Sequence, residues 1–129
     1  MGDRANFGFK TNGHTLYLYG HWAGENMLGN LANALEVARP RWTDPSYATR
    51  ITVSQMIGDD WNQELGWGLT VDELCDNEHK VPVVDFDKGT VTLLDREMKK
   101  VVFSEFLPQF VERYAKASLK PPIDTIPLF

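Results

Sequence analysis

Cysteine is nearly absent from this sequence of 129 residues, and histidine is scarce: Cys75 is the one cysteine, and there are three histidines. A single cysteine excludes an internal disulfide and a zinc site built from paired cysteines, which favours a reducing, cytoplasmic setting. No apolar run approaches the roughly 18 to 20 residues that cross a membrane. We therefore expect no membrane association.

Positive charge is also in short supply. The sequence has 13 Lys and Arg against 18 Asp and Glu, a formal net charge of −5. A negative protein repels phosphate backbones, so we expect no nucleic-acid partner. The motifs of common enzymes are missing too: "GWG" lacks the third glycine of a dinucleotide fingerprint, and there is no phosphate-binding loop or nucleophile elbow. The sequence predicts no catalytic residue, no metal ligand and no cofactor.

The composition is that of a compact domain. Hydrophobic residues make up 43% of the chain, too many for a disordered protein. We predict a single α+β domain over residues 1–117. Residues 118–129 form an apolar tail interrupted by prolines, which excludes a regular helix there. The tail is expected either to drape over the core or to dock on another chain.

Asn12-Gly13 is the strongest local signal, because both residue types tolerate the positive φ angles of a two-residue type I′ turn. The turn predicts a hairpin whose register places Phe7 opposite Leu18 and Phe9 opposite Leu16. Alternation puts these four side chains on one apolar face. The opposite face is predicted to carry Arg4, Asn6, Tyr17, Tyr19 and His21.

Two helices are predicted after this hairpin. Apolar residues recur at three- and four-residue intervals over residues 27–38, and Pro40 ends that pattern. The next helix is indicated by Asp44 as a capping residue, Pro45 at the first helical position and Gly58 as a stop.

The second half of the chain alternates strand and turn signals. "ELGWGLTV" predicts a strand, and "KVPVVDFDKGTVTLL" predicts a hairpin that turns at residues 87–89, with Pro82 placing its first strand at an edge or delaying its pairing. Ser104 predicts the start of a final helix whose apolar stripe includes Phe106 and Phe110. The predicted order β-β-α-α-β-β-β-α describes an α+β fold, a mostly antiparallel sheet of about five strands packed with helices.

His21 and Trp22 form the first candidate site, at the corner between strand and helix. The register sets His21 across from Arg4, with Asn6 and Tyr19 on the same face. Such a cluster could bind an anion through Arg4 with His21 as a donor. The alternative, a hydrogen-bonded structural corner, is commoner for histidine. Alternation directs Trp22 to the apolar side, so Trp22→Ala is expected to cost folding, whereas His21→Ala is not.

Two further segments contribute candidates. "ARPRWTDPSY" brings Arg41 near Tyr47, a basic and aromatic group that either grips a phosphate or packs against neighbouring carboxylates. "DELCDNEH" joins carboxylates to His79, either as a metal site or as a solvated acidic loop, and its spacing matches no metal motif. The candidate binding residues are therefore Arg4, Asn6, Tyr19, His21, Arg41, Tyr47, Asn77 and His79.

Five short segments in the same order, "MGDRAN", "YLYGHWAG", "RWTDPSYATRI", "GWGL" and "DNEHKVPVVD", resemble a family of small bacterial and phage proteins without an assigned activity. The resemblance covers roughly residues 1–93. The chain departs from the family pattern at Gly20, where the pattern has Thr, and at Ala23, where it has Gly. The resemblance implies a bacterial or phage origin and the cytoplasm of a bacterium or an infected cell.

The leading hypothesis for function is a non-enzymatic binding protein that captures a host protein or a small anionic ligand such as a nucleotide. Net negative charge without a catalytic motif, a polar and aromatic cluster and an apolar tail all favour it. One alternative is a small hydrolase that uses His21 or His79 with carboxylates for acid–base or metal chemistry. The other is a structural subunit of a homo-oligomer assembled through the tail.

Overall fold

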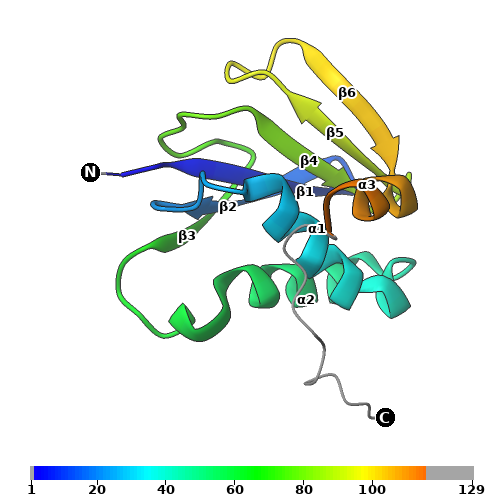
Figure 1. The fold of residues 1–129 in the computed structure, drawn as a ribbon, viewed down its shortest axis with the longest axis horizontal. Helices are drawn as coiled ribbons and strands as arrows, with labels where there is room; N and C mark the ends of the chain where they lie inside the picture. Colours follow the sequence, from blue (N-terminus) through cyan, green and yellow to red (C-terminus); the bar gives the residue numbers. More distant parts are fainter. Residues whose placement is uncertain (1, 116–129) are drawn as a thin grey trace.

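The structure, a computed structural model, describes residues 2–115. Six strands form one sheet in the order β3-β2-β1-β4-β5-β6, and three α-helices lie on one of its faces (Figure 1). This arrangement confirms the predicted α+β class and adds β6, a strand where the sequence predicts a helix. The predicted tail, residues 118–129, and any assembly through it lie outside the described residues.

The helices and strands have the following bounds. The strands are β1 (Ala5–Thr11), β2 (His14–Gly20), β3 (Trp67–Val71), β4 (Val81–Asp85), β5 (Thr90–Leu94) and β6 (Val101–Phe106). The helices are α1 (Met27–Val37), α2 (Pro45–Ile57) and α3 (Leu107–Tyr114), with 3₁₀ turns at Arg39–Arg41 and Gly58–Asp60. Every neighbouring pair of strands is antiparallel except β1 and β4. Within residues 2–115, no helix has the length and apolarity that a membrane crossing requires.

The first hairpin confirms the predicted register. Asn12 and Gly13 have φ angles of 53° and 79°, and the ladder pairs Phe7 with Leu18 and Phe9 with Leu16. The ladder ends one pair earlier than expected, at Ala5 and Gly20, so Arg4 and His21 are not a strand pair. The chain instead closes there through the backbone N–H of Asp3, which donates to the His21 carbonyl at 2.7 Å.

The core lies between the sheet and the helices. Phe7 and Leu18 from the hairpin, Leu35 from α1 and Phe110 from α3 are fully buried. Each such side chain contributes about 1.5 to 3 kcal/mol when it leaves water. Thr52, in a β-branched stretch of α2, is also buried, and its hydroxyl donates to the Ala48 carbonyl one turn earlier at 2.7 Å. Both predicted helices of the first half are confirmed.

The last helix begins later than predicted. Ser104 lies inside β6, where its hydroxyl bonds that of Thr92 at 2.8 Å, so it caps no helix. α3 starts at Leu107, and the Gln109 side chain accepts the N–H of Phe106 at 3.2 Å. Phe106 is exposed, so it does not belong to the buried stripe of α3.

The second hairpin departs from prediction in two details. β4 is an interior strand between β1 and β5, which excludes the edge position considered for it. Its pairing with β1 begins only at Val83, after Pro82, as predicted, whereas its pairing with β5 already includes Val81 and Pro82. The turn spans residues 86–89, one residue more than predicted, and Gly89 has the expected positive φ of 71°.

Candidate functional site

Residues 72–80 connect β3 to β4 across the sheet, and the buried side chain of Asn6 holds this crossover. Asn6 points away from the helices, because its neighbour Phe7 points toward them. Its amide nitrogen donates to the Asp76 carbonyl at 3.0 Å and to Oδ1 of Asn77 at 3.3 Å. Its amide oxygen accepts the N–H of Cys75 at 3.3 Å. Asn6 therefore positions the loop, and none of its polar atoms faces solvent.

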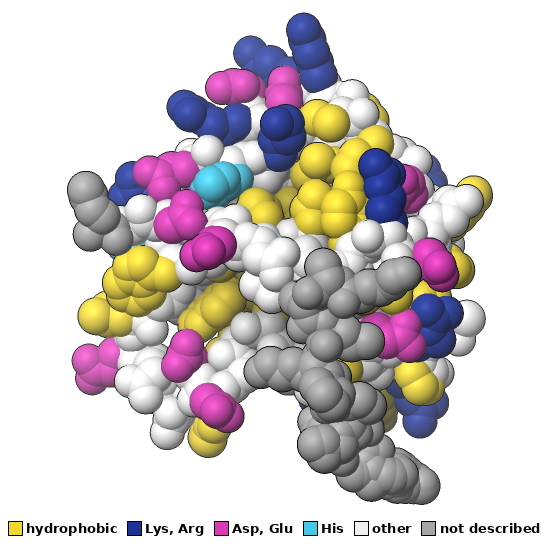
Figure 2. Space-filling model, viewed as in Figure 1, with side chains coloured by type: hydrophobic (Ala, Val, Ile, Leu, Met, Phe, Trp, Pro, Cys, Tyr) yellow, Lys and Arg dark blue, Asp and Glu magenta, His cyan; other side chains and the backbone are white. Residues whose placement is uncertain are grey.

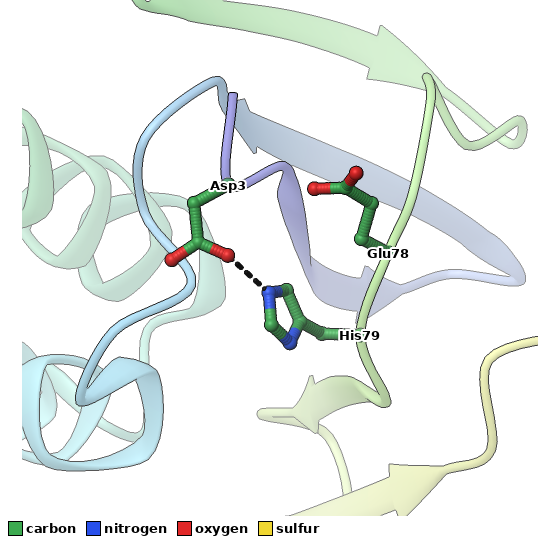
Figure 3. A group of neighbouring side chains, drawn as sticks. All are labelled: Asp3, Glu78 and His79. Carbon is green, nitrogen blue, oxygen red and sulfur yellow. Dashed lines mark hydrogen bonds and ion pairs between the residues drawn. The ribbon is translucent and has the colours of Figure 1, made fainter. Parts of the chain in front are cut away.

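The crossover brings His79 against the beginning of the chain (Figure 3). Nε2 of His79 lies 2.6 Å from Oδ1 of Asp3, and one ligand atom each from Asp3, Glu78 and His79 lie within 4.8 Å of one another. Gly24 makes this contact sterically possible: a Cβ there would lie 2.2 Å from Nε2 of His79. The N–H of Gly24 also donates to the Asp3 carbonyl at 3.0 Å.

Arg4 is paired with carboxylates inside this cluster. Its backbone N–H donates to Oε1 of Glu78 at 2.9 Å, and its guanidinium donates to Oε2 at 3.2 Å and lies 4.0 Å from Asp76. The hydrogen bond from the Arg4 backbone is the main reason that the pKa of Glu78 is lowered. Two carboxylates thus face one guanidinium, and the carboxylate of Asp3 lies beside that of Glu78. The negative charge of these carboxylates repels an anion. Carboxylates together with His79 suit a divalent cation, but the positive charge of Arg4 repels such an ion.

His21 is adjacent to the same cluster. Its Nδ1 lies 2.7 Å from the hydroxyl of Tyr19. A Cβ on Gly2 would lie 2.8 Å from Nε2 of His21 and 3.2 Å from Cγ of Arg4, which shows that both side chains flank Gly2. Burial raises the pKa of Tyr19, against the opposing effect of Arg4. Six of the eight predicted binding residues are thus brought together: Arg4, Asn6, Tyr19, His21, Asn77 and His79.

The other two predicted residues lie elsewhere. The guanidinium of Arg41 lies 5.6 Å from the ring centroid of Tyr47, at the beginning of α2. Both side chains are exposed. They share no hydrogen bond or ion pair with the cluster within the part of the chain that the structure describes, so they do not extend that site.

Trp22 is not a core residue, contrary to the prediction. Its side chain is 61% exposed. The alternation that directed it inward ends with β2 at Gly20, because the next residue already belongs to a turn. The Trp22 ring packs edge-on against His21, with centroids 4.7 Å apart, and lies over Gly66. Trp22→Ala is therefore expected to leave folding largely intact.

Trp22 is part of a larger exposed apolar area that the sequence analysis did not identify. We call this area the β3 surface; it consists of Trp22, Leu65 and the half-buried Trp67, which line one hollow, with the exposed Trp61 of the preceding loop and Leu69 and Val71 of β3 itself. Leu69 and Val71 point toward the helix side of the sheet, yet they are 56% and 62% exposed because no helix covers them. Figure 2 shows hydrophobic side chains at the left of the molecule, beside acidic ones, where Figure 1 places β3 and the loop before it.

The β3 surface contains a hollow of about 680 Å³. Trp22 and Trp67 line it together with the carboxylates of Asp60 and Glu64. The whole stretch of residues 51–79 has no Lys or Arg. It carries seven acidic residues: Asp59, Asp60, Glu64, Asp72, Glu73, Asp76 and Glu78. This local excess of acidic residues was the available sequence signal for the surface.

A second hollow, of about 450 Å³, lies between the first turn of α1 and the end of α3. Lys80 and Arg113 line it together with His79. Arg113 pairs with Glu105 and lies over the rings of Phe103 and Tyr114. Lys80, Arg113 and His79 thus bring several potential cations to one cavity.

No protein-family model, curated protein or solved structure matches the chain. The resemblance to small bacterial and phage proteins therefore stays a prediction. The features that bear on function are the β3 surface and the second hollow.

Proposed function

We propose that this chain is a non-enzymatic binding protein that captures another protein through the β3 surface. The observation that carries the proposal is the exposure of Trp61 and Leu65, each 75% accessible, on the loop that leads into the equally uncovered Leu69 and Val71 of β3, with Leu65 and Trp22 lining the same hollow. Contiguous apolar areas of this kind mark interaction sites, and tryptophan is the residue type most enriched at the energetic centre of interfaces.

A protein partner is favoured over a small anion at the predicted cluster. Arg4, the cation on which anion binding would depend, is already paired with Glu78 and Asp76. Moving it to a ligand would leave those carboxylates without their partner. We therefore assign the cluster a structural role: it holds the crossover, residues 72–80, that follows β3.

The test is affinity capture from a bacterial lysate with the full chain and two matched double variants. One replaces Trp61 and Leu65 with Ser on the β3 surface. The other replaces Val102 and Phe106, which are also exposed, with Ser on β6. A protein retained by the wild type and the β6 variant but lost by the β3 variant would be purified and titrated by calorimetry. Retention that the β3 variant leaves unchanged would contradict the proposal.

Capture of a small anion at the second hollow is a second candidate, favoured by the exposed Lys80, which lines it beside Arg113, itself paired with Glu105. Calorimetric titration with inorganic phosphate and with adenosine monophosphate tests this function. Binding that Lys80→Ala removes and Lys88→Ala preserves would support it, because Lys88 is an exposed lysine in the turn between β4 and β5. Absence of heat with both probes would exclude it.

A further inference from the structure

We propose that the partner of the β3 surface is an extended segment bearing Lys or Arg, which pairs with β3 as an additional strand. This inference rests on the proposed function and specifies the partner's chemistry. Within residues 2–115, β3 pairs only with β2, so its other edge meets no strand.

The hydrogen bonds at the two ends of β3 show which of its backbone groups face outward. His21 donates to the Gly66 carbonyl at 2.8 Å, and Asp72 donates to the Thr15 carbonyl at 2.7 Å. In an antiparallel ladder, residues bonded to the neighbouring strand alternate with residues whose N–H and C=O point away from it. The outward residues of β3 are therefore Trp67, Leu69 and Val71. These are the residues whose side chains belong to the β3 surface.

A peptide strand at this edge gains both kinds of contact. Its backbone pairs with that of Trp67, Leu69 and Val71, and alternate side chains cover the exposed Leu69 and Val71. Strand addition of this type obtains affinity from main-chain hydrogen bonds and specificity from alternate side chains.

Charge decides which peptide fits. Acidic residues precede and follow β3 in the sequence. Asp60 and Glu64 come before the strand and Asp72 and Glu73 come after it, and all four are exposed. The hollow at the start of the strand combines two tryptophan rings with two carboxylates. A Lys or Arg side chain is the group that both an indole face and a carboxylate attract.

The same charges disfavour a second copy of the chain at this edge. Two β3 edges would place acidic residues against acidic residues, and like charges across an interface cost free energy. The opposite edge, β6, is preceded by Lys99 and Lys100, so its charge would suit the β3 edge of a second copy. The pairing of β6 with β5, however, is interrupted by a register shift at Leu93 and Leu94 of β5. Such a bulge twists an edge strand away from pairing.

The experiment uses three short fluorescent peptides and the full chain. One alternates Val and Thr with Arg at every third or fourth position, the second has Glu in place of Arg, and the third keeps Arg but carries N-methyl groups on alternate backbone nitrogens. We expect the Arg peptide to bind at least about tenfold more tightly than either of the others. Asp60→Asn with Glu64→Gln should weaken it by a similar factor, whereas Lys99→Gln with Lys100→Gln should not.

Hydrogen exchange of the free and bound chain completes the test. Binding of the Arg peptide should protect the amides of Trp67, Leu69 and Val71. Equal binding of the N-methylated peptide would overturn strand addition, and equal binding of the Glu peptide would overturn the charge argument. If these amides are protected in the free chain, the edge of β3 is already occupied. Protection that rises with protein concentration would assign the edge to a second copy, and protection that does not depend on concentration would assign it to the chain itself. If a protein is captured through the β3 surface but no peptide binds, this inference fails and the proposed function stands.

Discussion

β3 and β6 end the same sheet at opposite sides, and both leave hydrophobic side chains in solvent, yet their edges are built differently. β6 follows Lys99 and Lys100, pairs with β5 through a shifted register and carries Ser104 and Glu105 among its apolar residues. β3 pairs with β2 in a continuous register, carries no charged side chain and is flanked in sequence by acidic residues. Lysines and bulges protect an edge from other chains. The contrast supports the proposal that the edge of β6 is protected and the edge of β3 is open to a partner.

The two edges also differ in how they are held. β6 joins β5 through a local turn, in which Asp95 accepts the N–H groups of Lys99 and Lys100 at 2.7 and 3.2 Å. β3 joins β4 through a crossover held by Asn6, which is about 70 residues away in sequence. The open edge therefore depends on a distant buried side chain.

Loss of the Asn6 side chain should have the largest effect, because it releases the crossover that follows β3. Asn6→Ala removes the bonds to Cys75, Asp76 and Asn77 and is expected to lower the free energy of unfolding by about 3 kcal/mol, measured by urea denaturation. Hydrogen exchange should accelerate in β3 more than in β6. The matched control, Asn62→Ala in the exposed loop before β3, should change stability by no more than about 0.5 kcal/mol. Equal effects of the two substitutions would contradict the role assigned to Asn6.

A lysine placed on each edge in turn should affect the two edges differently. Leu69→Lys puts a cation in the middle of β3, against the strand that the Arg peptide is expected to form, and should weaken binding of that peptide by more than about tenfold, measured by fluorescence polarisation. Val102→Lys, at a comparably exposed site on β6, should leave that affinity unchanged. Thermal melting should differ little between them, and equal loss of affinity would show that the two edges do not differ.

Removing the protection of β6 should reduce the difference between the edges. Lys99→Val with Lys100→Val exposes a longer apolar edge, so the variant should self-associate at concentrations where the wild type does not, measured by light scattering. Lys88→Val removes a lysine from the turn between β4 and β5 and serves as the control. A double variant that scatters like the wild type would mean that the bulge alone protects β6.

Acid should loosen both edges to a small and similar extent. The pKa of Asp72, which follows β3, is lowered mainly by the N–H of Thr15 in β2, and that of Asp95 by the N–H of Lys99 before β6. Because both pKa values fall below the ordinary 3.8, each contribution is complete above about that pH and is lost as the pH falls through the lowered value. Asp72→Asn should remove the acid sensitivity of exchange near Thr15 only. Sensitivity that persists there would contradict this assignment.

The parts of the fold that could be predicted from the sequence are those fixed by local chemistry. Asn12 and Gly13 set the first register because few residues adopt their positive φ angles. β6 was missed because its turn contains no such residue: Met98 has a φ of 65°, a conformation typical of glycine or asparagine. Without a turn signal, the apolar residues around Phe106 resemble a helical stripe.

The candidate site was predictable only in part, for a related reason. Period-two alternation put Asn6, Tyr19 and His21 on one face, and the structure keeps them together. The pairing of His79 with Asp3 depends on the path of the crossover, which no local pattern specifies. The exposure of Trp22 depends on where β2 ends and on which side of the sheet the helices leave uncovered.

We propose that another protein is held at the edge of β3 and not at that of β6. The decisive experiment is residue-resolved hydrogen exchange of the full chain, with and without the captured protein. We expect the amides of Trp67, Leu69 and Val71 to become protected while those of β6 exchange as before. Protection that falls on Val101–Phe106, or that spares β3, would contradict it.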